Sequence, residues 1–238
     1  MAINVEVLKT RALTAVVFVA VMLVGLLWNE WSFIILFTII HFGCWYEFVK
    51  LMKKIYCEQY LKYCLFGLIY ISLPILLIID LFFFDKIFYG SIHGNSPNKI
   101  PYSVTIPLAI IIAIWINDTM AYLVGSLIGK TPFSKISPKK TWEGTIGGII
   151  IGSIATGVFE FLFNAWAYLN WPFYKWFFIA LIAAIFGTAG DLLESKLKRM
   201  ANVKDSGAIM PGHGGFLDRF DSLLVAVPFV WLYVKLFI

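Results

Sequence analysis

Charged residues are scarce in this sequence. Only 14% of the 238 residues are charged and 61% are hydrophobic, whereas soluble domains carry about 25% charged residues. Polar linkers that could separate two domains are missing, and so are the alternating ten-residue strands of outer-membrane barrels. Because lipid admits only helices or closed barrels, the sequence predicts an all-α integral membrane protein, a polytopic helical bundle in which residues 1–238 form one membrane-embedded domain.

Cysteine and histidine are also rare, with three of each in the chain. The cysteines show no C-x-x-C pairing, so a metal bound here is expected to have oxygen ligands rather than a zinc set. The sequence contains no Walker A motif and no nucleophile elbow. It also lacks the inverted repeat of many transporters. These absences disfavour a P-loop ATPase, a serine hydrolase and a transporter.

Apolar runs of about twenty residues recur, and each is long enough to cross a bilayer as a helix. Pro74 is expected to kink the third run, and a total of six to nine spans fits the pattern. We count about seven runs, at 11–28, 31–50, 62–85, 103–128, 144–163, 174–194 and 222–238.

The distribution of lysine and arginine predicts the orientation of these spans. If the N-terminus is cytoplasmic, most of the 19 basic residues fall on inner segments, as the positive-inside rule requires. The two longest basic loops, 129–143 and 195–221, then face the cytoplasm, where nucleotides are found.

Two polar residues, Asn117 and Asp118, interrupt an apolar run. An intramembrane carboxylate indicates a functional site, although an interhelical hydrogen bond would also explain Asn117. Nearby, small residues recur every fourth position, which favours close packing of the fourth and fifth spans. These small residues are Ala121, Gly125 and Gly129, followed by Gly144, Gly148 and Gly152.

The segment 137–144 begins with serine and proline, which fits a helix N-cap followed by the first helical residue. A helix N-terminus beside Lys139 and Lys140 would make a phosphate-binding site. The alternative is that these lysines only anchor the chain at the inner membrane face.

Carboxylates gather near the last two spans. Asp191, Glu194 and Ser195 share a helix face, and Asp218 and Asp221 stand where the final helix is expected to begin. Such carboxylates suit Mg²⁺, although a surface ion pair of Asp218 with Arg219 or Lys204 is an alternative. Histidine titrates near neutral pH. His213 lies among glycines, which leave it free to reach a phosphate, and this titration range would allow it acid–base work.

Residues 195–221, which end in Pro-Gly-His-Gly-Gly-Phe-x-Asp-Arg-Phe-Asp, resemble the signature of the phosphatidate cytidylyltransferases, or CDP-diacylglycerol synthases. Segments 117–130, 137–144 and 190–195 resemble the same family. The resemblance implies that the phosphate of phosphatidic acid attacks the α-phosphorus of CTP, giving CDP-diacylglycerol and pyrophosphate. Residues 1–100, which match the family only in being hydrophobic, are expected to form N-terminal helices, and residues 103–238 are expected to form the catalytic helices and cytoplasmic loops.

The resemblance implies Mg²⁺ as cofactor, with a second cation allowed, and no nucleic-acid partner. Membrane lipids, CTP and phosphatidic acid are the expected partners, a homodimer is left open, and the expected location is the inner or plasma membrane. The expected metal ligands are Asp118, Asp191, Asp218 and Asp221, and the expected catalytic set is these four with Lys198 and Arg219. The expected substrate-binding residues are Asn117, Lys139, Lys140, Ser195, Lys198, Arg199, Lys204, His213, Gly214 and Gly215.

Two alternatives remain at this point. The same chemistry on an isoprenoid lipid phosphate is the first, because contacts to lipid chains are diffuse along a sequence. A transporter that uses Asp118 as a coupling site is the second. The missing repeat and the one-sided polar cluster argue against the transporter.

Overall fold

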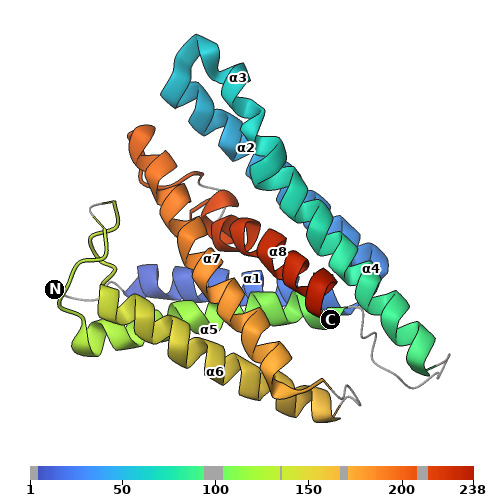
Figure 1. Ribbon diagram of the computed structural model, residues 1–238. Coiled ribbons are helices and arrows are strands. Elements are labelled where there is room, and N and C mark those ends of the chain that lie inside the picture. Colours follow the sequence, from blue (N-terminus) through green and yellow to red (C-terminus); the bar gives the residue numbers. More distant parts are fainter. Residues whose placement is uncertain (1–4, 94–103, 135, 167–170, 208–213) are drawn as a thin grey trace. The chain divides into compact units, whose positions relative to one another are not determined.

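The computed structural model describes residues 5–93, 104–134, 136–166, 171–207 and 214–238. Every helix or strand assigned among them is helical, and an isolated β-bridge joins Pro132 to Thr141. The longer helices are α1 (Val5–Leu27), α2 (Glu30–Tyr56), α4 (Leu73–His93), α5 (Thr105–Ile128), α6 (Trp142–Trp166), α7 (Phe173–Met200) and α8 (Leu217–Phe237). This confirms the all-α prediction (Figure 1).

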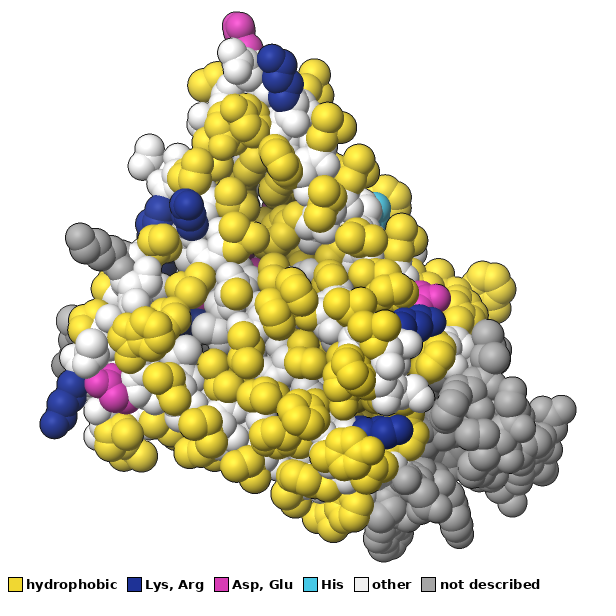
Figure 2. Space-filling view, in the orientation of Figure 1, with side chains coloured by type: hydrophobic (Ala, Val, Ile, Leu, Met, Phe, Trp, Pro, Cys, Tyr) yellow, Lys and Arg dark blue, Asp and Glu magenta, His cyan; other side chains and the backbone are white. Residues whose placement is uncertain are grey.

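Five helical segments among the described residues are long and apolar enough to cross a membrane. They are Glu30–Cys64, Thr105–Ile128, Trp142–Phe163, Phe173–Met200 and Leu217–Phe237, and two shorter apolar helices, Leu13–Leu27 and Leu68–Phe84, fall in further predicted runs. Hydrophobic side chains cover most of the face in Figure 2. The protein is therefore a polytopic membrane protein, while seven spans and a cytoplasmic N-terminus stay predictions.

The chain forms two compact units. Unit 1 comprises Met1–Ile75 and Lys196–Phe220, and unit 2 comprises Leu76–Ser195 and Asp221–Ile238. Helices α7 and α8 contribute residues to both units. The single membrane-embedded domain stays a prediction.

In unit 1, helix α2 starts with a capping box. The Asn29 side chain accepts the Ser32 N–H at 2.8 Å, and the Ser32 hydroxyl accepts the Asn29 N–H at 3.0 Å. Such a box satisfies two N–H groups that the helix leaves free. The helix ends at Tyr56, and a 3₁₀ turn, Cys57–Gln59, leads into α3, Tyr60–Cys64. A π-helical stretch, Leu68–Ser72, precedes Pro74. The third apolar run, 62–85, is therefore irregular close to the proline that was expected to kink it.

In unit 2, α5 and α6 lie side by side (Figure 1). A Cβ atom added at Gly144 would lie 2.7 Å from the Ala121 carbonyl oxygen, and one at Gly148 would lie 2.8 Å from the Ala121 backbone nitrogen. Gly152 is likewise close to the Asn117 backbone, at 3.0 Å. The small residues therefore let the two backbones touch, which confirms the packing prediction.

Replacing Gly148 with alanine should lower the stability of the protein in detergent by about 1–3 kcal/mol, because the new methyl group meets backbone atoms that cannot rotate away. Thermal unfolding followed by circular dichroism measures the change. Gly187→Ala in α7 is the matched control, since its nearest neighbours lie at 3.5 Å, an ordinary contact. An equal loss of stability in both variants would contradict the explanation from close packing.

Candidate active site

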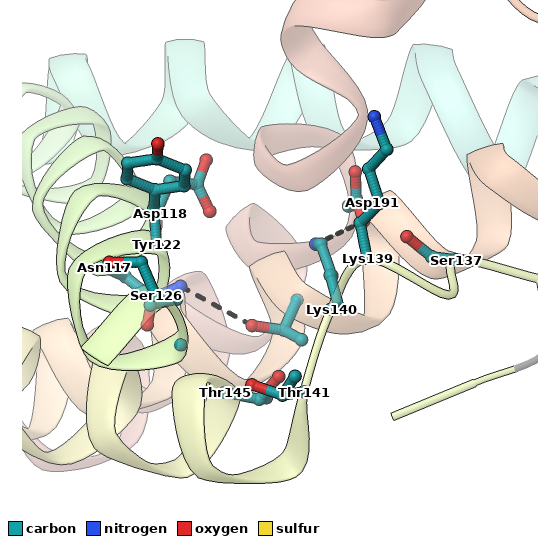
Figure 3. Close-up of a pocket in the computed structure, with 13 residues that line it drawn as sticks. Asn117, Asp118, Tyr122, Ser126, Ser137, Lys139, Lys140, Thr141, Thr145 and Asp191 are labelled. Atoms are coloured by element: carbon teal, nitrogen blue, oxygen red, sulfur yellow. Dashed lines mark hydrogen bonds and ion pairs between the residues drawn. The ribbon is translucent and has the colours of Figure 1, made fainter. Parts of the chain in front are cut away.

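A cavity of about 440 Å³ lies in unit 2 (Figure 3). Its walls come from α5, the loop between α5 and α6, the first turns of α6, and α7. The polar side chains that line it are those of Asn117, Asp118, Tyr122, Ser126, Ser137, Lys139, Lys140, Thr141, Thr145, Thr188 and Asp191. The cavity therefore gathers five of the residues that the sequence predicted as site residues: Asn117, Asp118, Lys139, Lys140 and Asp191.

Helix α5 presents a polar stripe to this cavity. Asp118, Tyr122 and Ser126 recur every fourth residue and so share one helix face. Asn117, next to them, is buried, and its amide nitrogen lies 3.5 Å from the Thr188 hydroxyl. The carbonyl oxygen of Asn117 is buried without a hydrogen-bond partner among the described residues. Asn117 therefore lines the cavity with a polar side chain whose hydrogen-bonding capacity is only partly used.

The loop before α6 holds two lysines against the cavity. The Trp142 N–H donates to the Thr131 carbonyl at 3.0 Å, and the Phe133 N–H donates to the Lys140 carbonyl at 2.8 Å. The Glu143 carboxylate accepts the Thr131 hydroxyl at 2.8 Å and the Thr131 N–H at 3.2 Å. These bonds tie both ends of the loop together, so that Lys139 and Lys140 line the cavity.

The predicted N-cap at Ser137 is wrong. The Ser137 carbonyl accepts the Lys140 N–H at 3.1 Å, which closes a turn around Pro138. Helix α6 begins at Trp142, and the Thr141 hydroxyl accepts the Gly144 N–H at 3.1 Å, as a cap does. A serine followed by proline starts a turn as readily as a helix. The lysines therefore face the cavity from a turn, not from a helix N-terminus.

Lys140 forms an ion pair with Asp191 of α7 (Figure 3). Both side chains remain about one-third exposed, at 33% and 31%, so the pair is accessible from the cavity. Asp118 interacts electrostatically with both partners. The cavity thus offers two ammonium groups for an anion and two carboxylates for a cation.

Unit 1 holds a second charged cluster around Asp218. Its Oδ1 lies 2.6 Å from Lys198 Nζ, and its Oδ2 accepts the N–H groups of Ser206 and Gly215, each at 2.8 Å. Gly214 has φ +83°, a conformation that favours glycine, and a Cβ there would lie 2.6 Å from Asp218. Gly214 and Gly215 therefore pack against the Asp218 carboxylate.

The other predicted residues lie in varied surroundings. Asp221 is buried in α8, and its carbonyl lies against Gly190, next to Asp191. Glu194 is buried, so it does not share the cavity with Asp191. Ser195 is half-buried, whereas Arg199, Lys204 and Arg219 are exposed. His213 lies outside the described residues.

Glu47 is a buried polar residue that was not among the predicted site residues. This residue is 1% exposed in the middle of α2, and its carboxylate accepts three hydrogen bonds from residues 206–217. The signal was present, because Glu47 interrupts an apolar run just as Asp118 does, and a carboxylate inside a membrane span indicates a function.

The donor set of the cavity fits Mg²⁺. The described residues contain no cluster of three or more histidine, cysteine, aspartate or glutamate side chains that could hold a metal. Mg²⁺, however, is commonly bound by one or two carboxylates together with substrate phosphates. Asp118 and Asp191 supply two carboxylates, and serine, threonine and tyrosine hydroxyl groups line the same cavity.

The fold and the cavity define a polytopic, all-α membrane protein that gathers lysines and aspartates in one pocket. The family model described as "Cytidylyltransferase family" matches residues 63–237. The chain belongs to this family, as the motifs of segments 117–144 and 190–221 predicted.

Curated relatives carry the name phosphatidate cytidylyltransferase. The Bacillus subtilis (strain 168) protein is 44% identical over 137 residues, which is 57% of this chain and 49% of that protein. The Synechocystis protein is 42% identical over 59% of this chain and 46% of its own length. The match therefore spans about half the length of these two relatives. The Rickettsia typhi protein is 34% identical over 92% of this chain and 88% of its own.

Proposed function

We propose that this protein transfers CMP from CTP to phosphatidic acid, forming CDP-diacylglycerol and pyrophosphate. The observation that carries the proposal is the pocket in which Lys139, Lys140, Asp118 and Asp191 meet, in a member of the cytidylyltransferase family. Ammonium groups neutralise phosphate charge, and a carboxylate pair suits the metal that accompanies nucleotide phosphates. The relatives are named for the same reaction.

The reaction needs positioning more than covalent work by the protein. A phosphate oxygen of phosphatidic acid forms a bond to the α-phosphorus of CTP, and the bond from that phosphorus to the pyrophosphate oxygen breaks. The attacking phosphate dianion has no proton to lose, so the step requires no general base. The protein's task is to hold two anions together and to offset their repulsion.

The residues of the cavity divide this task. Lys139 and Lys140 bind phosphate oxygens, and Asp191 holds Lys140 in place through their ion pair. Asn117 contributes a polar wall to the substrate pocket. Asp118 and Asp191 would hold Mg²⁺, which, when bound, neutralises charge on the phosphates and on the leaving pyrophosphate.

A second set of predicted substrate-binding residues lies in unit 1. Lys198, which is 14% exposed beside Asp218, and the segment that includes Gly214 and Gly215 bind the phosphates of CTP. Arg199, Lys204 and Arg219 are exposed cations that add to the attraction of nucleotide. We place the active site on the cytoplasmic side, where the positive-inside rule puts the basic loops.

The purified protein in mixed micelles, given labelled CTP, phosphatidic acid and Mg²⁺, is expected to form labelled CDP-diacylglycerol. Removing Mg²⁺ with EDTA should abolish the product, and adding Mg²⁺ back should restore it, because the substrate phosphates would otherwise repel one another. A polyprenyl phosphate replaces phosphatidic acid in a parallel reaction. Product from the polyprenyl phosphate alone, or turnover unaffected by EDTA, would contradict the proposal.

A further inference from the structure

Helix α2 contains a buried carboxylate, that of Glu47, which does not line the cavity of unit 2. Glu47 is 1% exposed and lies between buried neighbours, Cys44 and Phe48. Burying a carboxylate is costly unless hydrogen bonds replace the lost water. Its partners therefore identify what this part of α2 is built to hold.

All three described donors to Glu47 come from one distant segment. The Phe216 N–H donates to Oε1 at 3.0 Å, the Leu217 N–H donates to Oε2 at 2.9 Å, and the Ser206 hydroxyl lies 2.7 Å from Oε2. Phe216 and Leu217 are at the start of α8, where N–H groups lack partners within the helix. Glu47 thus binds this helix start as an anion would.

Glycines on both sides make the approach close enough. A Cβ at Gly207 would lie 2.1 Å from Glu47 Oε1, and one at Gly215 would lie 2.2 Å from both carboxylate oxygens. One turn before Glu47, a Cβ at Gly43 would lie 2.4 Å from the Phe216 ring. A larger residue at any of these three positions would force the Glu47 carboxylate or the Phe216 ring to shift, and so would disturb this contact.

The same residues contact the charged pair of unit 1, Lys198 and Asp218. Ser206 contacts both carboxylates, since its hydroxyl lies 2.7 Å from Glu47 Oε2 and 2.8 Å from Asp218 Oδ2. The Ser206 N–H also donates to Asp218, which in turn pairs with Lys198. A fixed chain of contacts therefore runs from Glu47 through Ser206 to Asp218 and Lys198.

We propose that Glu47 is a positioning residue that holds Ser206 and the Gly215–Leu217 segment in the geometry that binds the phosphates of CTP. The inference rests on the proposed function and deepens it. The family model matches from residue 63 onward, so the residue that holds this segment lies outside the matched region. Helix α2 then serves the substrate site as well as spanning the membrane.

The test uses Glu47→Gln in the full chain, with Glu58→Gln as control. The Glu47→Gln substitution keeps the size of the side chain but replaces one charged acceptor oxygen with an N–H donor that faces other donors. Hydrogen exchange followed by mass spectrometry should show the peptide containing Phe216 and Leu217 exchanging roughly tenfold to a hundredfold faster, with α5 and α6 unchanged. Glu58 is exposed outside this cluster, so its variant should behave as wild type.

Kinetics separate positioning from general damage. In Glu47→Gln, the KM for CTP should rise by about tenfold or more while the KM for phosphatidic acid stays constant, and Glu47→Asp should recover part of the loss. A purely structural role would lower the amount of active enzyme, and hence only the apparent kcat. Unchanged CTP KM in Glu47→Gln would overturn the proposal.

Two further outcomes are decisive. If Glu47→Gln does not fold, Ser206→Ala is the second variant, because it removes the hydroxyl that lies between the two carboxylates. In Ser206→Ala, the peptide containing Phe216 and Leu217 should exchange faster, and the KM for CTP should be higher. Wild-type exchange in that peptide would reject the positioning role. If the wild-type protein forms no CDP-diacylglycerol, the proposed function fails, whereas the exchange data still decide whether Glu47 fixes the segment.

Discussion

Asp191→Asn is expected to lower CTP-dependent product formation by about a hundredfold to a thousandfold. The substitution keeps the size of the side chain but removes the charge that holds Lys140. It also removes one of the two carboxylates that line the cavity. Because Asp118 and Asp191 are the proposed Mg²⁺ ligands, the Mg²⁺ concentration needed for half-maximal activity should rise as well.

Initial rates over a Mg²⁺ titration measure both effects. Asp80→Asn is the matched control, because Asp80 also pairs with a lysine in unit 2, at 2.9 Å from Lys235 Nζ, but does not line the cavity. The control should keep wild-type turnover and Mg²⁺ dependence. Wild-type turnover in Asp191→Asn, with the protein inserted and folded, would remove Asp191 from the active site.

A further comparison separates the two roles of Asp191. Lys140→Met removes the ion pair but leaves both carboxylates, so it should lower turnover and raise the KM for the substrate whose phosphate it binds. Its Mg²⁺ midpoint should stay near that of the wild type. If both variants shift the midpoint equally, the ion pair itself, rather than the carboxylate, sets the metal affinity.

The sequence was sufficient to predict the helices and most of the cavity. Apolar runs locate α2 and α5–α8 because burial in lipid depends on composition more than on distant contacts. Asp118, Lys139, Lys140 and Asp191 were predicted as site residues because charge near a membrane is costly and therefore indicates function. The structure places all four around one pocket.

The turn at Ser137, the role of Glu47 and the surroundings of Asp218 could not be predicted, because they depend on contacts between residues that are distant in the sequence. Ser137 fits both a cap and a turn, and the choice was set by bonds from residues 130–133 to residues 140–143. Glu47 and Ser206 are 159 positions apart, so nothing near Glu47 shows what it binds. The surroundings of Asp218, likewise, could not be read from its acidic neighbours.

Asp218→Asn is expected to lower turnover by about a hundredfold or more. Both oxygens of Asp218 are already engaged, Oδ1 by Lys198 and Oδ2 by Ser206 and Gly215. In asparagine one of them becomes an N–H donor that faces other donors. Hydrogen bonds to charged groups contribute about 1.5–3 kcal/mol each, so Lys198 and the glycine segment should lose their fixed positions together.

The Mg²⁺ titration then distinguishes two explanations for that loss. The sequence predicted Asp218 as a metal ligand, whereas its four protein contacts favour a role in holding Lys198 and the segment. If Asp218 holds Lys198 and the segment, Asp218→Asn should leave the Mg²⁺ concentration for half-maximal activity unchanged and raise the KM for CTP. Combining it with Lys198→Met should then add little further loss, because residues that act as one unit are not additive. A raised Mg²⁺ midpoint together with additive losses would instead place Asp218 among the metal ligands.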